Sequence, residues 1–294
     1  ISELQLDKSQ WKLTKFGDVA IQQKGKVDRE NTDLTRYVQG GHMNSEDLHL
    51  RSWGELEDEY LGPAFIRRFD EGDILYGSRR TYLRKVVIAP FSGITSNTTF
   101  VIRANEKNID KRLLPFIMMS EGFTENSVRN SKGSVNPYIN WKDIAKYEFL
   151  LPPKEQQVQL ANLLWAMDNV IENIIGNIEA NKRLQSSAVK ELCLKNSRSK
   201  KMKLDSLIDH LEAGVSVNSK EGEVAEGDYG ILKTSSVSMG YFIPTEVKKV
   251  VQKDQSRLKA PVRKNTIIIS RMNTVELVGA NAFVDDKIEN TFLP

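Results

Sequence analysis

The sequence predicts an α+β protein with a globular domain, a long coiled-coil helix and a second, incomplete copy of the domain. Three observations lead to this prediction. Short β-branched and apolar runs alternate with helical patterns in the first half, heptads follow two adjacent prolines, and short motifs recur on both sides of the heptads. The expected segments are 1–152 for the first domain, 153–195 for the helix, 196–203 for a basic linker and 204–294 for the partial second domain.

Composition limits the class of protein. A chain of 294 residues is long enough for two domains. No run of 18 apolar residues and no secretory leader is present, so we expect no membrane span. The single cysteine, Cys193, excludes an internal disulfide framework and leads us to expect a cytoplasmic protein. One cysteine and three histidines cannot build a zinc site of the Cys/His type, so no metal is expected.

The first domain is predicted to mix strands with helices. Apolar or β-branched runs bounded by Gly, Pro or Asn predict strands at 74–76, 86–89 and 98–102. Apolar residues at helical spacing predict a helix over 110–120, with Asp110 as its N-cap. A helical turn at 141–145 and a last strand at 147–151 complete the domain.

A long helix is predicted to follow Pro152 and Pro153, each of which fixes φ and removes an N–H. Six apolar residues then recur at alternating spacings of four and three, as in the a/d seam of a coiled coil: Leu160, Leu164, Met167, Ile171, Ile174 and Ile178. A helix from about Lys154 to Lys195 is roughly 60 Å long. The seam has no second helix in this chain, so such an exposed stripe favours self-association.

Short motifs after the helix repeat those before it. Trp11-Lys12-Leu13 corresponds to Met202-Lys203-Leu204, 191 residues later, and the Ser-Arg pairs at 78–79 and 270–271 are 192 residues apart. Both copies then run through a polar loop into β-branched residues, which for the second copy span 278–284. Two matches at nearly one offset predict a duplicated domain. The second copy is about 60 residues shorter, so we expect a fragment, or the ordered part, of a longer duplicated protein.

No motif in the sequence indicates catalysis. Asn136-Pro137-Tyr138 superficially resembles the Asn-Pro-Pro-Tyr signature of adenine methyltransferases, which holds a flipped base. One proline is absent, and no Gly-rich loop follows a strand to hold a nucleotide cofactor, so a simple turn is the favoured interpretation. We therefore expect no catalytic residue and no cofactor in this chain.

Basic loops point instead to nucleic acid. Arginine presents a planar donor fork that fits phosphate or the O6/N7 edge of guanine, and hydroxyl groups favour phosphate oxygens. Three loops of the first domain and one of the second combine these groups, with the candidate DNA-binding residues Lys24, Lys26, Arg79, Arg80, Thr81, Tyr82, Arg84, Lys85, Arg129, Ser131, Lys132, Arg271 and Asn273. Each loop alone also fits a solvated surface loop, and the basic linker fits a solvated hinge equally well. The net charge of +3 permits a nucleic-acid partner without demonstrating one.

These residues together resemble the specificity subunits of type I restriction–modification systems. The resemblance covers essentially the whole chain. It is carried by Leu151-Pro152-Pro153-Lys154-Glu155-Gln156 with the heptad helix, and by the Ser-Arg-Met-Asn-Thr-Val-Glu-Leu-Val-Gly run at 270–279.

The resemblance implies that each recognition domain reads one half of a split DNA target and that two antiparallel helices set the distance between the halves. It further implies a non-catalytic subunit whose partners are double-stranded DNA, modification subunits and restriction subunits. The modification subunits, which bind S-adenosylmethionine, methylate adenine. The chain departs from the family where the second helix and the rest of the second domain are missing, so pairing of two copies through the helix is a further hypothesis.

Two other functions remain open at this stage. A coiled-coil scaffold that binds only proteins would lack the salt-dependent DNA affinity that phosphate contacts produce. A degenerate adenine methyltransferase would bind S-adenosylmethionine by itself. A coiled-coil transcription factor is disfavoured, because no basic helix precedes the heptads. The sequence does not give the target bases or the spacer between them.

Overall fold

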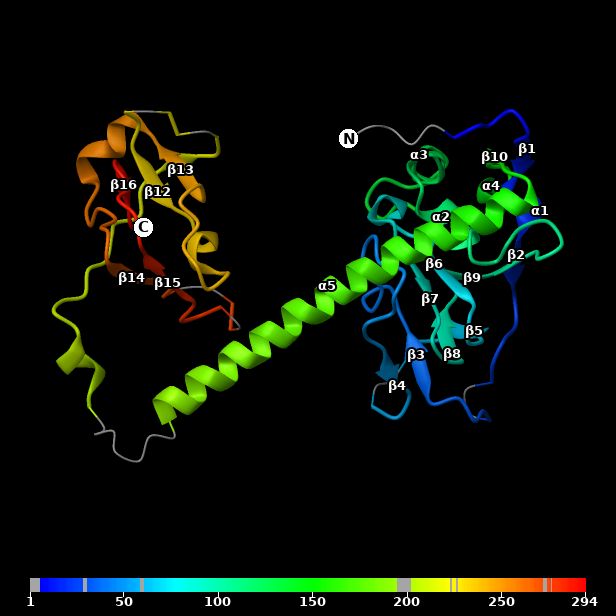
Figure 1. Cartoon of the computed structure of the whole chain (residues 1–294), viewed down its shortest axis with the longest axis horizontal. Coiled ribbons are helices and arrows are strands. Elements are labelled where there is room, and N and C mark those ends of the chain that lie inside the picture. Colours follow the sequence, from blue (N-terminus) through cyan, green and yellow to red (C-terminus); the bar gives the residue numbers. More distant parts are fainter. Residues whose placement is uncertain are drawn as a thin grey trace. The chain divides into compact units, whose positions relative to one another are not determined.

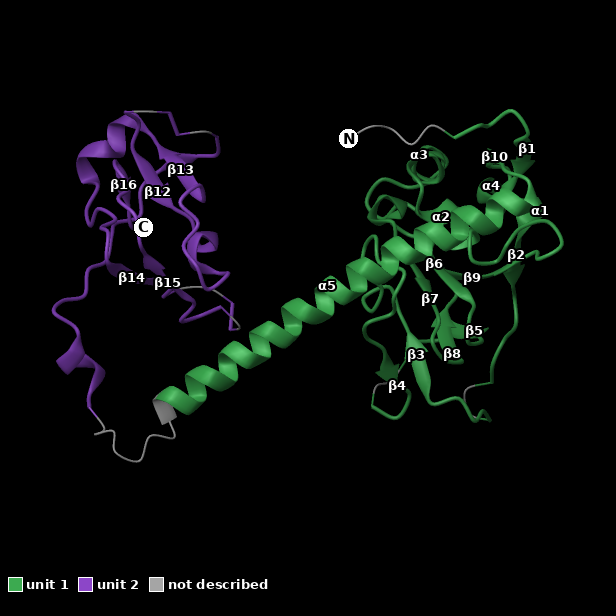
Figure 2. Cartoon of the chain, in the orientation of Figure 1, with its two compact units in different colours: residues 1–194 green, residues 195–294 purple. Residues whose placement is uncertain are grey.

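A four-stranded sheet of order β2-β9-β6-β7 forms the centre of the first of two units, residues 1–194 and 195–294, into which the chain divides (Figures 1 and 2). The computed structural model describes residues 6–28, 31–58, 61–194, 202–222, 224–225, 227–271, 274–275 and 277–294. The elements of the first unit are β1 (Lys12–Lys15), α1 (Phe16–Val19), β2 (Ala20–Gln23), β3 (Arg36–Val38), β4 (Gly54–Glu55), β5 (Phe65–Phe69), β6 (Ile74–Gly77), the 3₁₀ turn η1 (Thr81–Leu83), β7 (Val86–Ile88), β8 (Gly93–Ser96), β9 (Thr99–Ala104), α2 (Leu114–Met119), α3 (Glu121–Arg129), α4 (Trp141–Ile144), β10 (Glu148–Leu151) and α5 (Lys154–Leu194).

The order of the central sheet decides where its loops emerge. β9 lies between β2 and β6 and is antiparallel to both, so β2 and β6 run parallel to each other. The end of β2 at Gln23 pairs with Val101, and the end of β6 at Gly77 pairs with Thr99. The loops that follow β2 and β6 therefore leave the same edge of the sheet. A second sheet of order β4-β3-β8-β5 completes this unit, apart from the β1–β10 pair.

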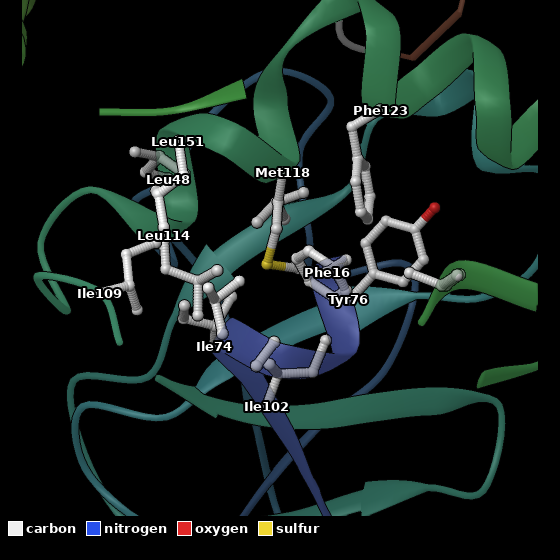
Figure 3. Close-up of a cluster of buried hydrophobic side chains, with 14 of the residues drawn as sticks. Phe16, Leu48, Ile74, Tyr76, Ile102, Ile109, Leu114, Met118, Phe123 and Leu151 are labelled. Carbon is white, nitrogen blue, oxygen red and sulfur yellow. The ribbon is translucent and has the colours of Figure 1, made fainter. Parts of the chain in front are cut away.

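Alternation along β6 builds two hydrophobic cores. Ile74 and Tyr76 face the helices, while Leu75 faces the second cluster with Val38 and Phe69. Figure 3 shows the helical side with Tyr76 among the buried residues, where the Phe123 ring centroid lies 5.7 Å from that of Tyr76. Each fully buried side chain of this size contributes about 1.5–3 kcal/mol through the hydrophobic effect.

Most predicted elements of the first domain are confirmed. The strands appear as β6, β7, β9 and β10, and the helical turn appears as α4. The predicted start of α2 is wrong: the helix begins at Leu114, with Leu113 rather than Asp110 as its N-cap. Pro115 fits the later start, because proline is favoured in the first turn of a helix, where its missing N–H has no intrahelical partner to lose. The Asp110 carboxylate instead accepts hydrogen bonds from Arg112.

Helix α5 consists of two halves that differ in their surroundings. It spans 41 residues, which makes it about 60 Å long, and it starts at Lys154 as predicted. The first half packs against the first unit, whereas every side chain from Gly176 to Leu192 is exposed. The predicted end at Lys195 lies outside the described residues.

The second unit repeats strand pairings of the first. β12 pairs antiparallel with β13 and parallel with β16, as β3 does with β4 and β8. β14 and β15 form an antiparallel pair, as β6 and β7 do. Of the β-branched run over 278–284, only Asn281–Val284 forms a strand, β15, because Gly279 takes a positive φ of 86° in the preceding turn. The elements are η2 (Leu204–Leu207), β11 (Ser219–Lys220), β12 (Gly230–Leu232), η3 (Thr234–Val237), β13 (Val247–Val250), η4 (Gln252–Arg257), β14 (Thr266–Ile269), β15 (Asn281–Val284) and β16 (Thr291–Phe292).

Candidate nucleic-acid interface

Two of the predicted basic loops leave the same edge of the central sheet. Lys24 and Lys26 follow β2, and the loop 78–85 follows β6. The first of these loops is held by β5, because Arg67 donates a hydrogen bond to the Lys24 carbonyl at 2.9 Å and the Arg68 N–H bonds to the Gly25 carbonyl. The side chains of Lys24 and Lys26 remain exposed.

The third basic loop pairs directly with the second. The Ile139 N–H donates to the Ser78 carbonyl at 2.9 Å, and the Arg80 N–H donates to the Pro137 carbonyl at 2.7 Å. On the other side of this segment, Lys132 and Tyr138 exchange two backbone hydrogen bonds of 2.8 and 2.9 Å. Residues 78–80, 137–139 and 132 thus form a small three-stranded ribbon, which gathers two of the predicted clusters into one surface.

Backbone geometry fixes the 78–85 loop. Arg80 and Arg84 flank the turn η1, and both take the left-handed conformation with φ of 48°. Residues other than glycine rarely adopt this region and do so at a cost of order 1 kcal/mol or more. The buried hydroxyl of Thr81 lies 3.1 Å from that of Ser131, which donates to the Ser127 carbonyl in α3. Thr81 and Ser131 therefore tie the two loops together beneath the surface.

The predicted contact residues fall into two groups. One group has exposed side chains: Arg79, Arg80, Tyr82, Arg129 and Lys132. Lys132 Nζ also lies 3.9 Å from the Asp143 carboxylate. Arg84 and Lys85 are half-buried and turn back onto an upstream loop. Arg84 pairs with the Glu46 carboxylate at 2.9 Å, and Lys85 donates to the Gly40 carbonyl at 2.5 Å. These bonds give Arg84 and Lys85 a structural role that the sequence alone did not indicate.

The candidate residues of the second unit follow β14. Arg271 is exposed and comes two residues after Ile269, the last residue of that strand. In the first unit, Arg79 likewise comes two residues after the end of β6 at Gly77. Asn273 lies outside the described residues. Two hairpins of the same pairing therefore each carry an arginine at the same distance beyond the first strand.

Residues 133–137 add exposed groups that were not among the predicted contacts. The predicted turn before Tyr138 is confirmed as a bend at 134–136, while Tyr138 itself lies in the extended ribbon. Gly133 has the positive φ of 89° that this sharp bend requires. Val135 is 93% exposed, and Tyr138 is 41% exposed. The sequence could have indicated the exposed Val135, because its neighbours Gly, Ser, Asn and Pro favour a short loop that cannot bury an apolar side chain.

The predicted seam of α5 is only partly covered. Leu160 and Leu164 are half-buried against the first unit. The four that follow are between 49% and 56% exposed: Met167, Ile171, Ile174 and Ile178. Met167 and Ile171 line a groove of about 410 Å³, with Phe116 and Met119 among its other apolar walls. The expected apolar stripe is therefore present on the surface of the helix.

Polar contacts on a neighbouring face hold α5 to its unit. The His49 ring nitrogen lies 2.9 Å from the Asp168 carboxylate. Arg51 donates to Glu172 at 2.8 Å, and this hydrogen bond lowers the pKa of the Glu172 carboxyl below its usual value. The indole N–H of Trp165 donates to the Arg112 carbonyl at 3.0 Å, while its ring packs edge-on against Phe116.

Among the residues that the structure describes, no group of three or more His, Cys, Asp or Glu side chains is placed to hold a metal ion. In the same part of the chain, no helix is long and apolar enough to cross a membrane.

Comparison with known proteins gives a consistent result. The family described as the type I restriction modification DNA specificity domain matches residues 8–180. The Escherichia coli type I restriction enzyme EcoDI specificity subunit is 28% identical over 181 residues, which are 57% of this chain and 37% of that protein. The Methanocaldococcus jannaschii type I restriction enzyme MjaVIII specificity subunit is 26% identical over 177 residues, 55% of this chain and 40% of that protein. The matches thus span less than half of these relatives' lengths.

Solved structures share the fold. The type I restriction–modification S subunit from M. genitalium has a TM-score of 0.52 at 16% identity, with 96% of this chain and 72% of that chain covered. A chain from a study of complex assembly and conformational transition of the type I R-M system has a TM-score of 0.51 at 17% identity, with coverage of 94% and 72%. At these identities the likeness concerns the fold alone.

Proposed function

The chain belongs to the family of type I restriction modification DNA specificity domains, and we propose that it is the sequence-reading part of a type I specificity subunit. It binds double-stranded DNA and directs adenine methylation and cleavage to a bipartite target. The observation that carries this proposal is the gathering of basic loops: those after β2 and β6 leave one sheet edge, and the loop after α3 joins the latter in a ribbon. Such a surface fits a phosphate backbone, because each cation that meets a phosphate releases bound counterions.

The second unit supports a reader of the other half-site. Its strand pairings match those of the first unit, and Arg271 stands where Arg79 stands relative to the preceding strand. The loop residues around the two arginines differ, as two readers of different sequences require. We propose that the two copies of the recognition domain are residues 1–152 and 204–294, and that α5 and the linker 196–203 join them.

The partners follow from α5. We propose that the helix carries modification subunits, which hold S-adenosylmethionine, and that restriction subunits join this complex. The chain itself contributes no catalytic residue and binds no cofactor, and it acts in the cytoplasm. The exposed stripe from Met167 to Ile178 needs a second apolar helix, and in the isolated chain a second copy of α5 supplies it. A protein-only scaffold would also use this stripe, but it would have no use for the basic ribbon.

Methylome sequencing tests the function. A host that carries this chain with its modification subunits should show a bipartite adenine-methylated motif, and deletion of the gene should abolish it. A methylome that is unchanged by the deletion would overturn the proposal. The affinity of the purified complex for DNA, measured at several salt concentrations, distinguishes a DNA-binding subunit from a protein-only scaffold. Only the DNA-binding subunit should show DNA affinity that falls steeply as the salt concentration rises.

A further inference from the structure

The segment from Lys132 to Tyr138 forms a hairpin, here called the 132–138 hairpin, whose tip is exposed to solvent. Its two ends exchange backbone hydrogen bonds of 2.8 and 2.9 Å, and residues 78–80 pair along its second strand. The residues from Lys132 to Asn136 are exposed, with Val135 at 93%. The hairpin is therefore held by backbone hydrogen bonds along one side and exposed at its tip.

A hydrogen bond joins Asn136 of this hairpin to Arg80 on the neighbouring strand. Asn136 Oδ1 accepts from Arg80 Nε at 3.3 Å, and the Arg80 backbone is fixed by its own bond to Pro137. The bond uses Nε and leaves both Nη groups of Arg80 without a partner among the described residues. The guanidinium is thereby aimed before any ligand arrives, which lowers the entropy lost on binding.

We propose that the 132–138 hairpin enters the major groove of the DNA target, where Arg80, positioned by Asn136, reads a guanine and Val135 meets a thymine methyl group. This inference rests on the proposed function and names the residues that determine specificity within it. The major groove is about 12 Å wide and admits a two-stranded ribbon, and its edges present guanine O6 and N7 and the thymine C5-methyl. Arg80 supplies the matching fork, and Val135 supplies the apolar contact.

The cations around the hairpin have a different role. Lys132 is the first residue of the hairpin, Arg129 precedes it at the end of α3, and Arg79 precedes Arg80 on the neighbouring strand. Exposed cations beside an element that enters a groove can contact the phosphates on either side of that groove. Such contacts position the protein on the DNA but carry no sequence information. We therefore expect the tip of the hairpin to contact the edges of the nucleobases and the cations around it to contact the DNA phosphates.

The test uses the complete complex with its modification subunits and a library of random duplexes. Arg80→Lys and Asn136→Ala should each relax the preference at one base pair of the selected motif by roughly 5- to 100-fold, with the salt dependence of binding nearly unchanged. Lys132→Ala is the matched control within the hairpin: it should weaken binding to all sequences and lower the salt slope, while the motif stays the same. Asn136 is exposed, so its variant keeps the test informative if Arg80→Lys fails to fold.

Uracil substitution tests the Val135 contact separately. Replacement of thymine by uracil removes only the C5-methyl, so at one motif position the wild-type complex should lose affinity several-fold and the Val135→Ala complex should not. The inference is overturned if Arg80→Lys and Asn136→Ala both select the wild-type motif with undiminished preference, or if no position responds to uracil. A wild-type complex that selects no motif at all would instead refute the proposed function.

Discussion

Arg51 donates hydrogen bonds from both Nη atoms to the carboxylate of Glu172, one of them at 2.8 Å. This ion pair joins the segment between β3 and β4 to the middle of α5. It lies four residues before the exposed half of the helix begins at Gly176. The pair therefore fixes the direction of α5 relative to the basic surface of the first unit.

Glu172→Gln should destabilise the first unit by about 0.5–1 kcal/mol at pH 7, as expected for a bidentate but partly exposed ion pair. Because the folded-state pKa of Glu172 is lowered, its contribution is fully present above the unfolded value near 4.3 and is lost as the pH falls through the folded value. Urea unfolding followed by tryptophan fluorescence reports on the first unit, since Trp11, Trp53, Trp141 and Trp165 all belong to it.

The control for this pair is Glu179→Gln, in the exposed half of the same helix. It should leave the stability unchanged at every pH. The difference between wild type and Glu172→Gln should shrink as the pH falls below about 4. A difference that persists undiminished at pH 3 would contradict the assignment of the effect to this ion pair.

Trp165→Ala should destabilise the first unit by about 2 kcal/mol. The side chain is half-buried, so the loss stays below the roughly 3–5 kcal/mol typical of fully buried aromatic residues. Trp165→Phe keeps the packing on Phe116 but loses the hydrogen bond to the Arg112 carbonyl, and should cost about 1 kcal/mol. Leu184→Ala, at a side chain 68% exposed on the free half of α5, should change the unfolding free energy by less than about 0.5 kcal/mol. Equal losses for Leu184→Ala and Trp165→Ala would refute the packing described for α5.

The double variant Ile171→Gln, Ile174→Gln should abolish self-association of the isolated chain. It removes two large apolar side chains from the centre of the exposed stripe and introduces no charge. Ser187→Gln, on the opposite face of the helix at 100° per residue, should leave self-association intact. Light scattering during size-exclusion chromatography measures the mass of both variants, and a double variant that still dimerises would show that another surface is used.

Lys24→Ala with Lys26→Ala should weaken DNA binding and reduce the magnitude of the salt slope by about two, roughly 0.9 for each lost phosphate contact. Lys107→Ala is a matched control, since this exposed lysine follows β9 at the opposite edge of the same sheet. It should leave the slope unchanged. Fluorescence anisotropy of the complex on labelled duplex between 50 and 200 mM salt, a range over which such contacts act strongly, measures the slope. Equal slopes for the wild type and the double variant would show that the loop after β2 makes no contact with DNA phosphates.

Local patterns in the sequence predicted individual elements. The run Ile74–Tyr76 and the heptads after Pro153 were recognisable because the residue types and spacings of neighbouring residues mark each element. The prediction of Asp110 as the N-cap was wrong, because aspartate is common in turns as well as at helix starts. Here Asp110 belongs to the turn before α2, where its carbonyl accepts from the Leu113 N–H.

The shape of the interface could not be predicted in the same way. The ribbon joins Arg80 to Pro137 across 57 positions of sequence, and Arg84 finds Glu46 across 38, so neither contact leaves a periodic signal. The sequence identified the basic loops, but it could not separate the cations that stay exposed from Arg84 and Lys85, which are used within the fold. Folding alone makes that selection, because only the folded chain decides which carbonyls and carboxylates lie within reach.

The uneven surroundings of α5 give one helix two very different rates of amide exchange. The half that packs on the first unit opens only when that unit unfolds, at least locally. The other half, from Gly176 to Leu192, is exposed along its whole length and starts at a glycine, which weakens a helix by about 1 kcal/mol relative to alanine. Its 17 residues are close to the length at which isolated helices in water are marginal. Deuterium uptake along this one helix should therefore be fast beyond Gly176 in the lone chain and slow once a partner covers the stripe, so that α5 itself records whether the complex has assembled.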